Sequence, residues 1–131
     1  MDNRKELKIA LIGLTIIIIF YWLAYENRKA QISRFRTLAQ QYDVSGCDYR
    51  QLSERCAEGK SVFFYSPQCQ GCLAAGRKLA EKDDVLYYDI TSDLKKTAEL
   101  KLEYVPAIMK IRNEEITFII GFEKIRKEIG R

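Results

Sequence analysis

The chain has 131 residues, 47% hydrophobic and 31% charged, which fits one small globular domain with an additional segment and excludes wholesale disorder. Residues 1–44 carry seven Lys/Arg and four Asp/Glu, while residues 45–131 carry fifteen and fourteen, so the nearly neutral C-terminal part lacks the basic footprint of nucleic-acid-binding proteins. Histidine is absent, which excludes Ser-His-Asp and Cys-His catalysis, His-containing zinc sites and imidazole copper sites.

The first predicted element is a membrane anchor. The segment Ile9 to Tyr25, IALIGLTIIIIFYWLAY, has no formal charge and ends in aromatic residues, which is typical of a short membrane-spanning helix. A cleaved signal peptide is disfavoured, because cleavage after Ala24 would place Trp22 at the −3 position. A buried core helix of such uniform apolarity is unusual in so small a chain. We therefore expect a tail over residues 1–8 and a transmembrane anchor over residues 9–25.

The orientation of this anchor rests on the cysteines. Lys and Arg flank both of its sides, so the positive-inside count is nearly even and slightly favours a domain on the inside. Four cysteines, however, suit an oxidising compartment. We expect a single-pass protein of a bacterial inner membrane, with a short cytoplasmic tail and an extracytoplasmic C-terminal domain.

Residues 26–44 show an amphipathic pattern, with apolar side chains recurring at three and four positions from Ile32 to Tyr42. This pattern predicts a helix that either continues the anchor as a stalk or lies on its own domain. Val44-Ser45-Gly46 indicates a break, so the globular domain is expected over residues 45–131.

The remaining elements alternate between helices and strands, which indicates an α/β domain with a mixed four-stranded sheet flanked by helices. Strands separated by helices imply parallel crossovers, and the last two strands form a hairpin. The predicted helices cover residues 48–57, 69–82, 94–102 and 122–130, and the predicted strands cover residues 61–66, 85–90, 106–111 and 115–120.

Two cysteines separated by two residues follow the first strand. Cys69 lies where this strand ends and a helix begins, and the free N–H groups of a helix N-terminus stabilise a thiolate there. Cys72 lies one turn further on the same face, so it can close a disulfide after Cys69 attacks a substrate disulfide. Pro67 stiffens the approach to this dithiol, and Gly71 keeps the loop flexible.

A second motif, YVPA, opens the third strand. We expect the Val105-Pro106 peptide to be cis and to lie near the dithiol, so that the backbone of Val105 can hydrogen-bond an extended substrate chain. Proline at the first position of a strand also occurs without any such role.

Together these motifs resemble the thioredoxin superfamily over residues 45–131. The resemblance rests on Cys69-Gln70-Gly71-Cys72 between a strand and a helix, on Val105-Pro106, and on Gly121 after the last strand. It implies a thioredoxin-like fold, with Cys69 as nucleophile, Cys72 as resolving thiol and Pro106 as the cis proline. Pro67, Gln70 and Gly71 are expected to support the dithiol. No cofactor is expected beyond the redox-active disulfide Cys69–Cys72.

Two positions depart from this family. Gln68 stands where thioredoxins carry a tryptophan, and Phe63 stands where they carry a buried carboxylate. Proton transfer would then require water, or Asp89 if the fold brings it near. The segments FFYSPQC and VPA look like those of membrane-tethered or periplasmic members, including those that accompany bacterial conjugation and secretion machines.

The other two cysteines, Cys47 and Cys56, bracket the first helix of the domain. Nine residues of regular helix would separate them by ~13 Å, too far for a disulfide. The interpretations are burial as small apolar residues, a structural disulfide in an irregular segment, and intermolecular or relay chemistry. A four-thiolate zinc site is disfavoured by the irregular spacing, and we expect no metal.

These features favour a membrane-tethered thiol–disulfide oxidoreductase that forms, reduces or isomerises disulfides in extracytoplasmic proteins. Its partners would be cysteine-containing protein substrates, the bilayer through residues 9–25, and a membrane redox partner or a secretion or conjugation complex. The alternative is a thioredoxin-like adaptor subunit of such an assembly with an idle dithiol. A metal carrier lacks support, because the chain has no histidine or methionine cluster.

Overall fold

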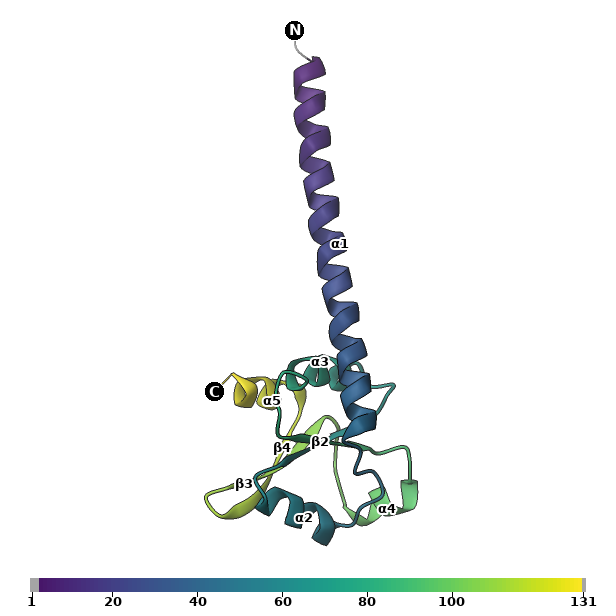
Figure 1. Ribbon diagram of the computed structural model, residues 1–131, viewed down its shortest axis with the longest axis vertical. Helices are drawn as coiled ribbons and strands as arrows, with labels where there is room; N and C mark the ends of the chain where they lie inside the picture. The colour runs from purple at the N-terminus through teal and green to yellow at the C-terminus, as the bar shows by residue number, and fades with distance from the viewer. Residues whose placement is uncertain (1–2, 131) are drawn as a thin grey trace. The chain divides into compact units, whose positions relative to one another are not determined.

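The computed structural model describes residues 3–130, which divide into two compact units with the boundary between Gln31 and Ile32. One helix, α1 (Asn3–Gln41), belongs to both units (Figure 1). The second unit begins at Ile32, and it includes the last turns of α1, which bury Phe35 and Ala39.

The part of α1 in the first unit is long and apolar enough to cross a membrane. Its most apolar window of 18 residues has a mean hydropathy of 2.3, and none of that window is buried within the protein. No break separates the apolar segment from residues 26–41, so the apolar and the amphipathic segments form one continuous helix.

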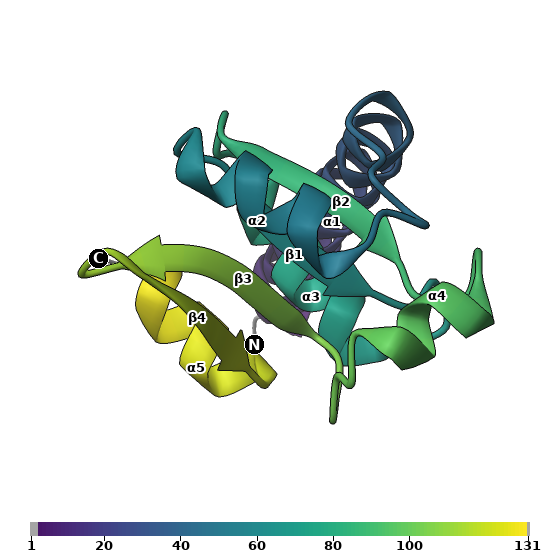
Figure 2. The same cartoon turned by 90° about the horizontal axis from the view of Figure 1, so that it is seen from below.

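The globular unit is an α/β domain with one mixed sheet in the strand order β2-β1-β3-β4 (Figure 2). β1 pairs in parallel with β2 and antiparallel with β3, and β3 and β4 form an antiparallel hairpin. The elements are α2 (Tyr49–Ala57), β1 (Ser61–Tyr65), α3 (Gln70–Leu79), β2 (Val85–Asp89), α4 (Leu94–Glu99), β3 (Ala107–Arg112), β4 (Glu115–Ile120) and α5 (Phe122–Ile129).

The direction of β3 corrects the expectation of parallel crossovers, which holds only between β1 and β2. A parallel β3 would require its connection to return across the sheet. The connection instead contains α4, a six-residue helix without a fully buried side chain. This short segment stays at the end of the sheet where β2 finishes, so β3 starts there and runs back.

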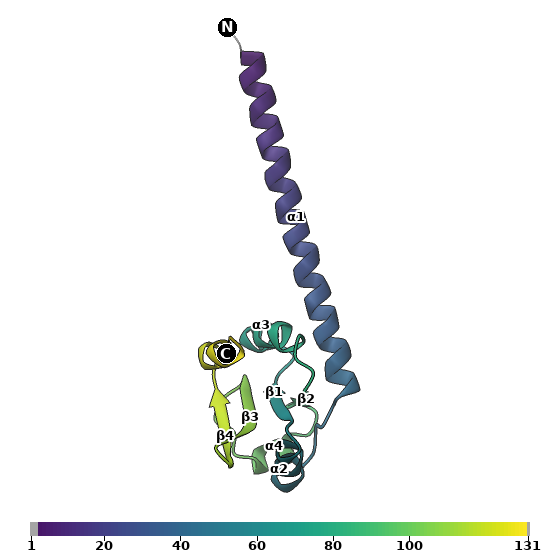
Figure 3. The same cartoon turned by 60° about the vertical axis from the view of Figure 1, so that its left-hand side comes forward.

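Helices cover both faces of the sheet. Figure 3 shows α3 and α5 on one side, with α2 and α4 on the other. Strand residues alternate between the two faces: Phe63 and Tyr87 join the core under α3 and α5, whereas Phe64 and Tyr88 join the core under α2. Because both faces are buried, the central strand β1 is apolar throughout its middle, as its sequence predicted.

Helix boundaries depend on local capping. The side chains of Asp48 and Gln51 form a capping box at the start of α2, which confirms the predicted helix start. α4 ends before Leu102, because Lys101 adopts a left-handed conformation with φ of 55°. α3 stops at Leu79 rather than at residue 82, since the Lys82 N–H donates to the Leu79 carbonyl in a closing turn (2.9 Å).

The end of α1 is attached to the sheet by Phe35. Its ring makes edge contacts with Phe63, Tyr65 and Tyr87, with centroids 5.3–6.0 Å apart. The ring also lies directly over Gly76 of α3: a Cβ added there would be 1.5 Å from Phe35 Cε2. The missing side chain at Gly76 thus creates the space that Phe35 fills.

We therefore predict that Gly76→Ala destabilises the globular unit by about 1–3 kcal/mol, as overpacking of a core does, despite the better helix propensity of alanine. The measurement is urea unfolding of the full chain in detergent, monitored by far-ultraviolet circular dichroism. Gly71→Ala on the same helix is the matched control, because its Cβ would meet nothing closer than 3.6 Å. Equal stability of the two variants would contradict this account of Phe35.

Candidate active site

The candidate site is built on the turn between β1 and α3. The Cys69 N–H donates to the Ser66 carbonyl at 3.1 Å, which closes a turn with Pro67 at its second position, where proline is favoured. Cys69 is the N-cap residue of α3, and its Sγ accepts a hydrogen bond from the Cys72 N–H at 3.1 Å. The cysteine thus takes the place that a serine or aspartate usually fills.

The two thiols of this motif differ in environment. Both are free, but Cys69 is half-buried and Cys72 is completely buried. Burial raises the pKa of Cys72 to about 12; its hydrogen bond to Cys69 and the charge of Cys69 act in the same direction, and a backbone hydrogen bond at Ser66 opposes them. Cys72 therefore stays protonated at neutral pH behind a more accessible Cys69.

The loop before β3 lies beside this dithiol. The Val105-Pro106 peptide is cis, and a Cβ placed on Gly71 would lie 3.6 Å from Pro106 Cδ and 4.0 Å from Cys69 Sγ. The Gly121 N–H donates to the Pro106 carbonyl at 2.9 Å. The structure therefore brings Cys69, Cys72, Gly71 and Pro106 together, and it adds the start of α5 to the same region.

The remaining predicted residues lie around this centre. Gln70 is exposed in the first turn of α3, and Val105 is half-buried against the core under α2. Within residues 3–130 the peptide groups of Val105 form no backbone hydrogen bond. Tyr104, which sequence reasoning did not select, is 71% exposed next to this loop. The sequence motifs also did not point to Phe122, although a Cβ added to Gly71 would lie 3.9 Å from the Cβ of Phe122.

The structure brings no buried carboxylate to the dithiol. Phe63 is fully buried, and among residues 3–130 no charged residue is buried. Asp89 ends β2, where its carboxylate accepts hydrogen bonds from the Thr91 N–H and hydroxyl at 2.9 and 2.6 Å. Its carboxylate is thus engaged in a local turn.

Cys47 and Cys56 are free thiols in this structure. Cys56 is buried in α2 and its thiol donates to the Met109 carbonyl at 3.5 Å, while Cys47 is half-buried against the same core. Burial raises the pKa of Cys56, consistent with a packing role. Among residues 3–130, no three Cys, Asp or Glu side chains come together as ligands for a metal ion.

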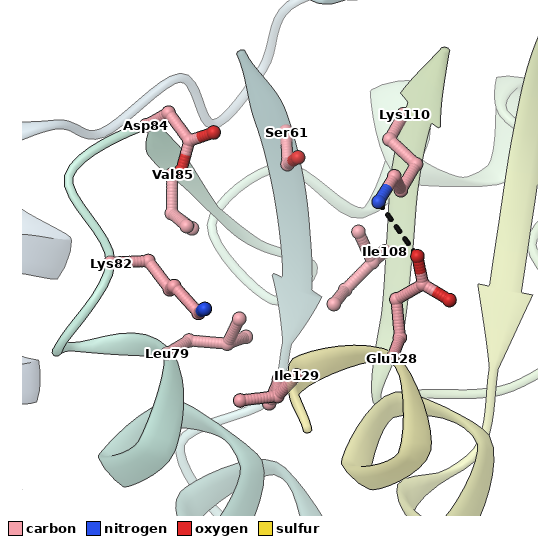
Figure 4. Close-up of a pocket in the computed structure, with 9 residues that line it drawn as sticks. All are labelled: Ser61, Leu79, Lys82, Asp84, Val85, Ile108, Lys110, Glu128 and Ile129. Atoms are coloured by element: carbon pink, nitrogen blue, oxygen red, sulfur yellow. Dashed lines mark hydrogen bonds and ion pairs between the residues drawn. The ribbon is translucent and has the colours of Figure 1, made fainter. Parts of the chain in front are cut away.

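A cavity of about 270 Å³ lies between the starts of β1 and β2 on one side and β3 and the end of α5 on the other (Figure 4). The Lys110 ammonium donates to a carboxylate oxygen of Glu128 at 2.8 Å, and Arg112 bonds the other oxygen. Lys82 and Asp84 add one charge of each sign to the lining, so the cavity has no net charge that favours a ligand class. Its place among the strand starts puts it at the opposite end of β1 from the dithiol.

Comparison with known proteins gives no family assignment: no family model matches the chain, and no curated protein matches it.

We predict that iodoacetamide at neutral pH modifies Cys69 at least about tenfold faster than Cys72, because only the thiolate is nucleophilic and Cys72 is buried and held protonated. Mass spectrometry of peptides from the full chain would give both rates. Cys56, which is also buried, is the internal control and should label as slowly as Cys72. Equal labelling of Cys69 and Cys72 in the folded protein would contradict the asymmetry.

Glu128 pairs with Lys110, as Figure 4 shows, and also with Arg112. The hydrogen bonds from Lys110 and then Arg112 lower the pKa of Glu128 to about 2 from its ordinary value of 4.5. A lowered folded-state pKa stabilises the fold above pH 4.5, and this contribution is lost as the pH falls from 4.5 towards 2. The destabilisation caused by Glu128→Gln should therefore be largest at neutral pH and shrink below pH 4.5. Urea unfolding at pH 7 and pH 2.5 measures this difference.

The matched control for this experiment is Glu123→Gln on the same helix. Glu123 pairs with Arg126, and both side chains are more than half exposed, so the expected effect is small at both pH values. A pH-independent effect of Glu128→Gln would be inconsistent with the proposed ion pairs.

Proposed function

We propose that this chain is a membrane-tethered thiol–disulfide oxidoreductase with a thioredoxin-like domain, acting on cysteines of extracytoplasmic proteins. The observation that carries the proposal is the Cys69 sulfur at the N-cap of α3, which accepts the Cys72 N–H at 3.1 Å. This position exposes the Cys69 sulfur at the start of a helix, in front of the buried Cys72, so Cys69 is the thiol placed to attack a client.

The exchange reaction follows from the two environments. The Cys69 thiolate attacks one sulfur of a client disulfide, the client S–S bond breaks, and the second client sulfur leaves as a thiolate that takes up a proton. Cys72 then releases its proton to solvent and attacks the Cys69 sulfur. The Cys69–Cys72 bond forms, the first client sulfur leaves, and two electrons have passed to the client. The reverse sequence oxidises a client dithiol.

The surroundings of the dithiol support binding of an extended client. The backbone of Val105 has no hydrogen-bond partner within residues 3–130, so it is open to a chain that pairs as an additional strand. Val105 and Pro106 are the substrate-binding residues in this proposal, with Pro67, Gln70 and Gly71 shaping the loop. The apolar part of α1 would hold the enzyme near membrane clients.

The alternative function is an adaptor subunit of a membrane secretion or conjugation assembly with an idle dithiol. It is favoured by the fully buried Phe63, which leaves no carboxylate beneath the site to accept the proton of Cys72. The redox experiment below separates the two functions.

The full chain in detergent, equilibrated with glutathione buffers of graded potential and trapped with an alkylating agent, should show Cys69 and Cys72 cycling as one couple. We expect a midpoint between roughly −270 and −120 mV, the range of dithiol oxidoreductases. A midpoint potential of about −250 mV or lower indicates a reductase, and a midpoint potential of about −150 mV or higher indicates an oxidant. Mass spectrometry identifies the oxidised pair.

Cys47→Ser is the control variant and should leave the midpoint unchanged, whereas Cys69→Ser and Cys72→Ser should abolish the couple. A folded protein in which Cys69 and Cys72 never cycle would rule out the oxidoreductase and favour the adaptor. In that case the two serine variants would still assemble with their membrane partners.

A further inference from the structure

A cavity of about 250 Å³ lies directly beside the dithiol turn. One wall consists of the end of α1, the other of the segments that flank the cysteines. Its lining residues are Phe35, Arg36, Ala39, Gln40, Tyr65, Pro67 and Leu73.

This cavity is fixed to Cys69 by backbone hydrogen bonds. Pro67 is inside the turn that the Cys69 N–H closes on the Ser66 carbonyl (3.1 Å), and the Leu73 N–H donates to the Cys69 carbonyl (3.1 Å). Two residues that line the cavity, Pro67 and Leu73, are thus held in place next to Cys69 in the chain. The cavity is therefore close enough to Cys69 to receive a side chain of a segment that binds there.

The chemistry of the lining is apolar with one cation. Arg36 is the only formally charged side chain among the seven, it is exposed, and no ion pair holds it within residues 3–130. Burial, followed by the charges of Asp89 and Asp43, raises the pKa of Tyr65 to about 12, so this phenol is neutral. Asp43 and Asp89 do not line the cavity.

The size of the cavity indicates its occupant. Sites for small molecules usually measure about 300–1,000 Å³, so this one suits one or two side chains rather than a cofactor. It is continuous with the dithiol turn, and its free cation is complementary to a carboxylate. An extended protein segment with an apolar and an acidic residue beside its cysteine fits all three features.

We propose that the last turns of α1 form a specificity wall for the dithiol, on which Arg36 selects client segments with an acidic residue close to the reactive cysteine. The apolar side chain next to that cysteine enters the cavity between Phe35 and Leu73. This inference rests on the proposed oxidoreductase function and assigns its substrate class.

The test uses the full chain in detergent with Cys47→Ser and Cys72→Ser, so that the reaction stops at the mixed disulfide. Synthetic peptides carry a cysteine joined to thionitrobenzoate, with leucine beside it and Glu, Gln or Lys two residues away on either side. Attack by Cys69 forms the protein–peptide disulfide and releases the thionitrobenzoate thiolate, whose absorbance gives the rate. We expect the Glu peptide to react about three- to tenfold faster than the Lys peptide at low salt.

Two variants of α1 provide the decisive comparison. Arg36→Glu should reverse the order of the peptides, and Arg36→Gln should remove the difference. Arg34→Glu is the matched control, because Arg34 lies on the same helix but lines a different cavity, and it should leave the order unchanged. The difference should also shrink at high salt, since the charges are exposed to solvent.

The outcomes distinguish the role of Arg36 from the proposed oxidoreductase function. No release above the background of Cys69→Ser with any peptide would overturn the proposed oxidoreductase. Release at equal rates from the Glu, Gln and Lys peptides would overturn the role of Arg36 and leave the oxidoreductase in place. An equal effect of Arg34→Glu and Arg36→Glu would show only general charge attraction and would also overturn the specificity wall.

Discussion

The contact between the Phe35 ring and Gly76 determines how the end of α1 meets the globular domain. A side chain at position 76 would exclude the ring, and without the ring Phe63, Tyr65 and Tyr87 would lose their shared aromatic neighbour. The same contact sets the last turns of α1 against α3, the helix that Cys69 caps. An element that begins as an apolar helix thereby becomes a wall of the cavity beside the turn that holds Cys69.

The end of β1 and the turn that follows it place the two thiols in different environments. β1 is central and buried on both faces, so its end is a rigid position in the domain. The turn at Pro67 then places Cys69 at the N-terminus of α3 while Cys72 enters the core. One thiol is thus kept accessible and the other kept protonated by a single change from strand to helix.

Much of this arrangement could be predicted from local sequence. Alternating apolar residues located β4, Asp48 located the start of α2, and Cys69 was recognised at a junction of strand and helix. The antiparallel direction of β3 could not be predicted, since it depends on how far the segment around α4 travels. The place of Phe35 depends on a glycine 41 residues away, a pairing that periodicity alone does not reveal, although the spacing of Ile32, Phe35 and Ala39 did indicate a buried face.

The capping of α3 by a cysteine sulfur ties the start of this helix to one reactive type of side chain. The Cys69 sulfur satisfies the Cys72 N–H at the first turn of the helix. Any modification that blocks or moves this sulfur would leave that N–H without its acceptor and would weaken the first turn of α3. The stability of this turn is therefore coupled to the chemical state of Cys69.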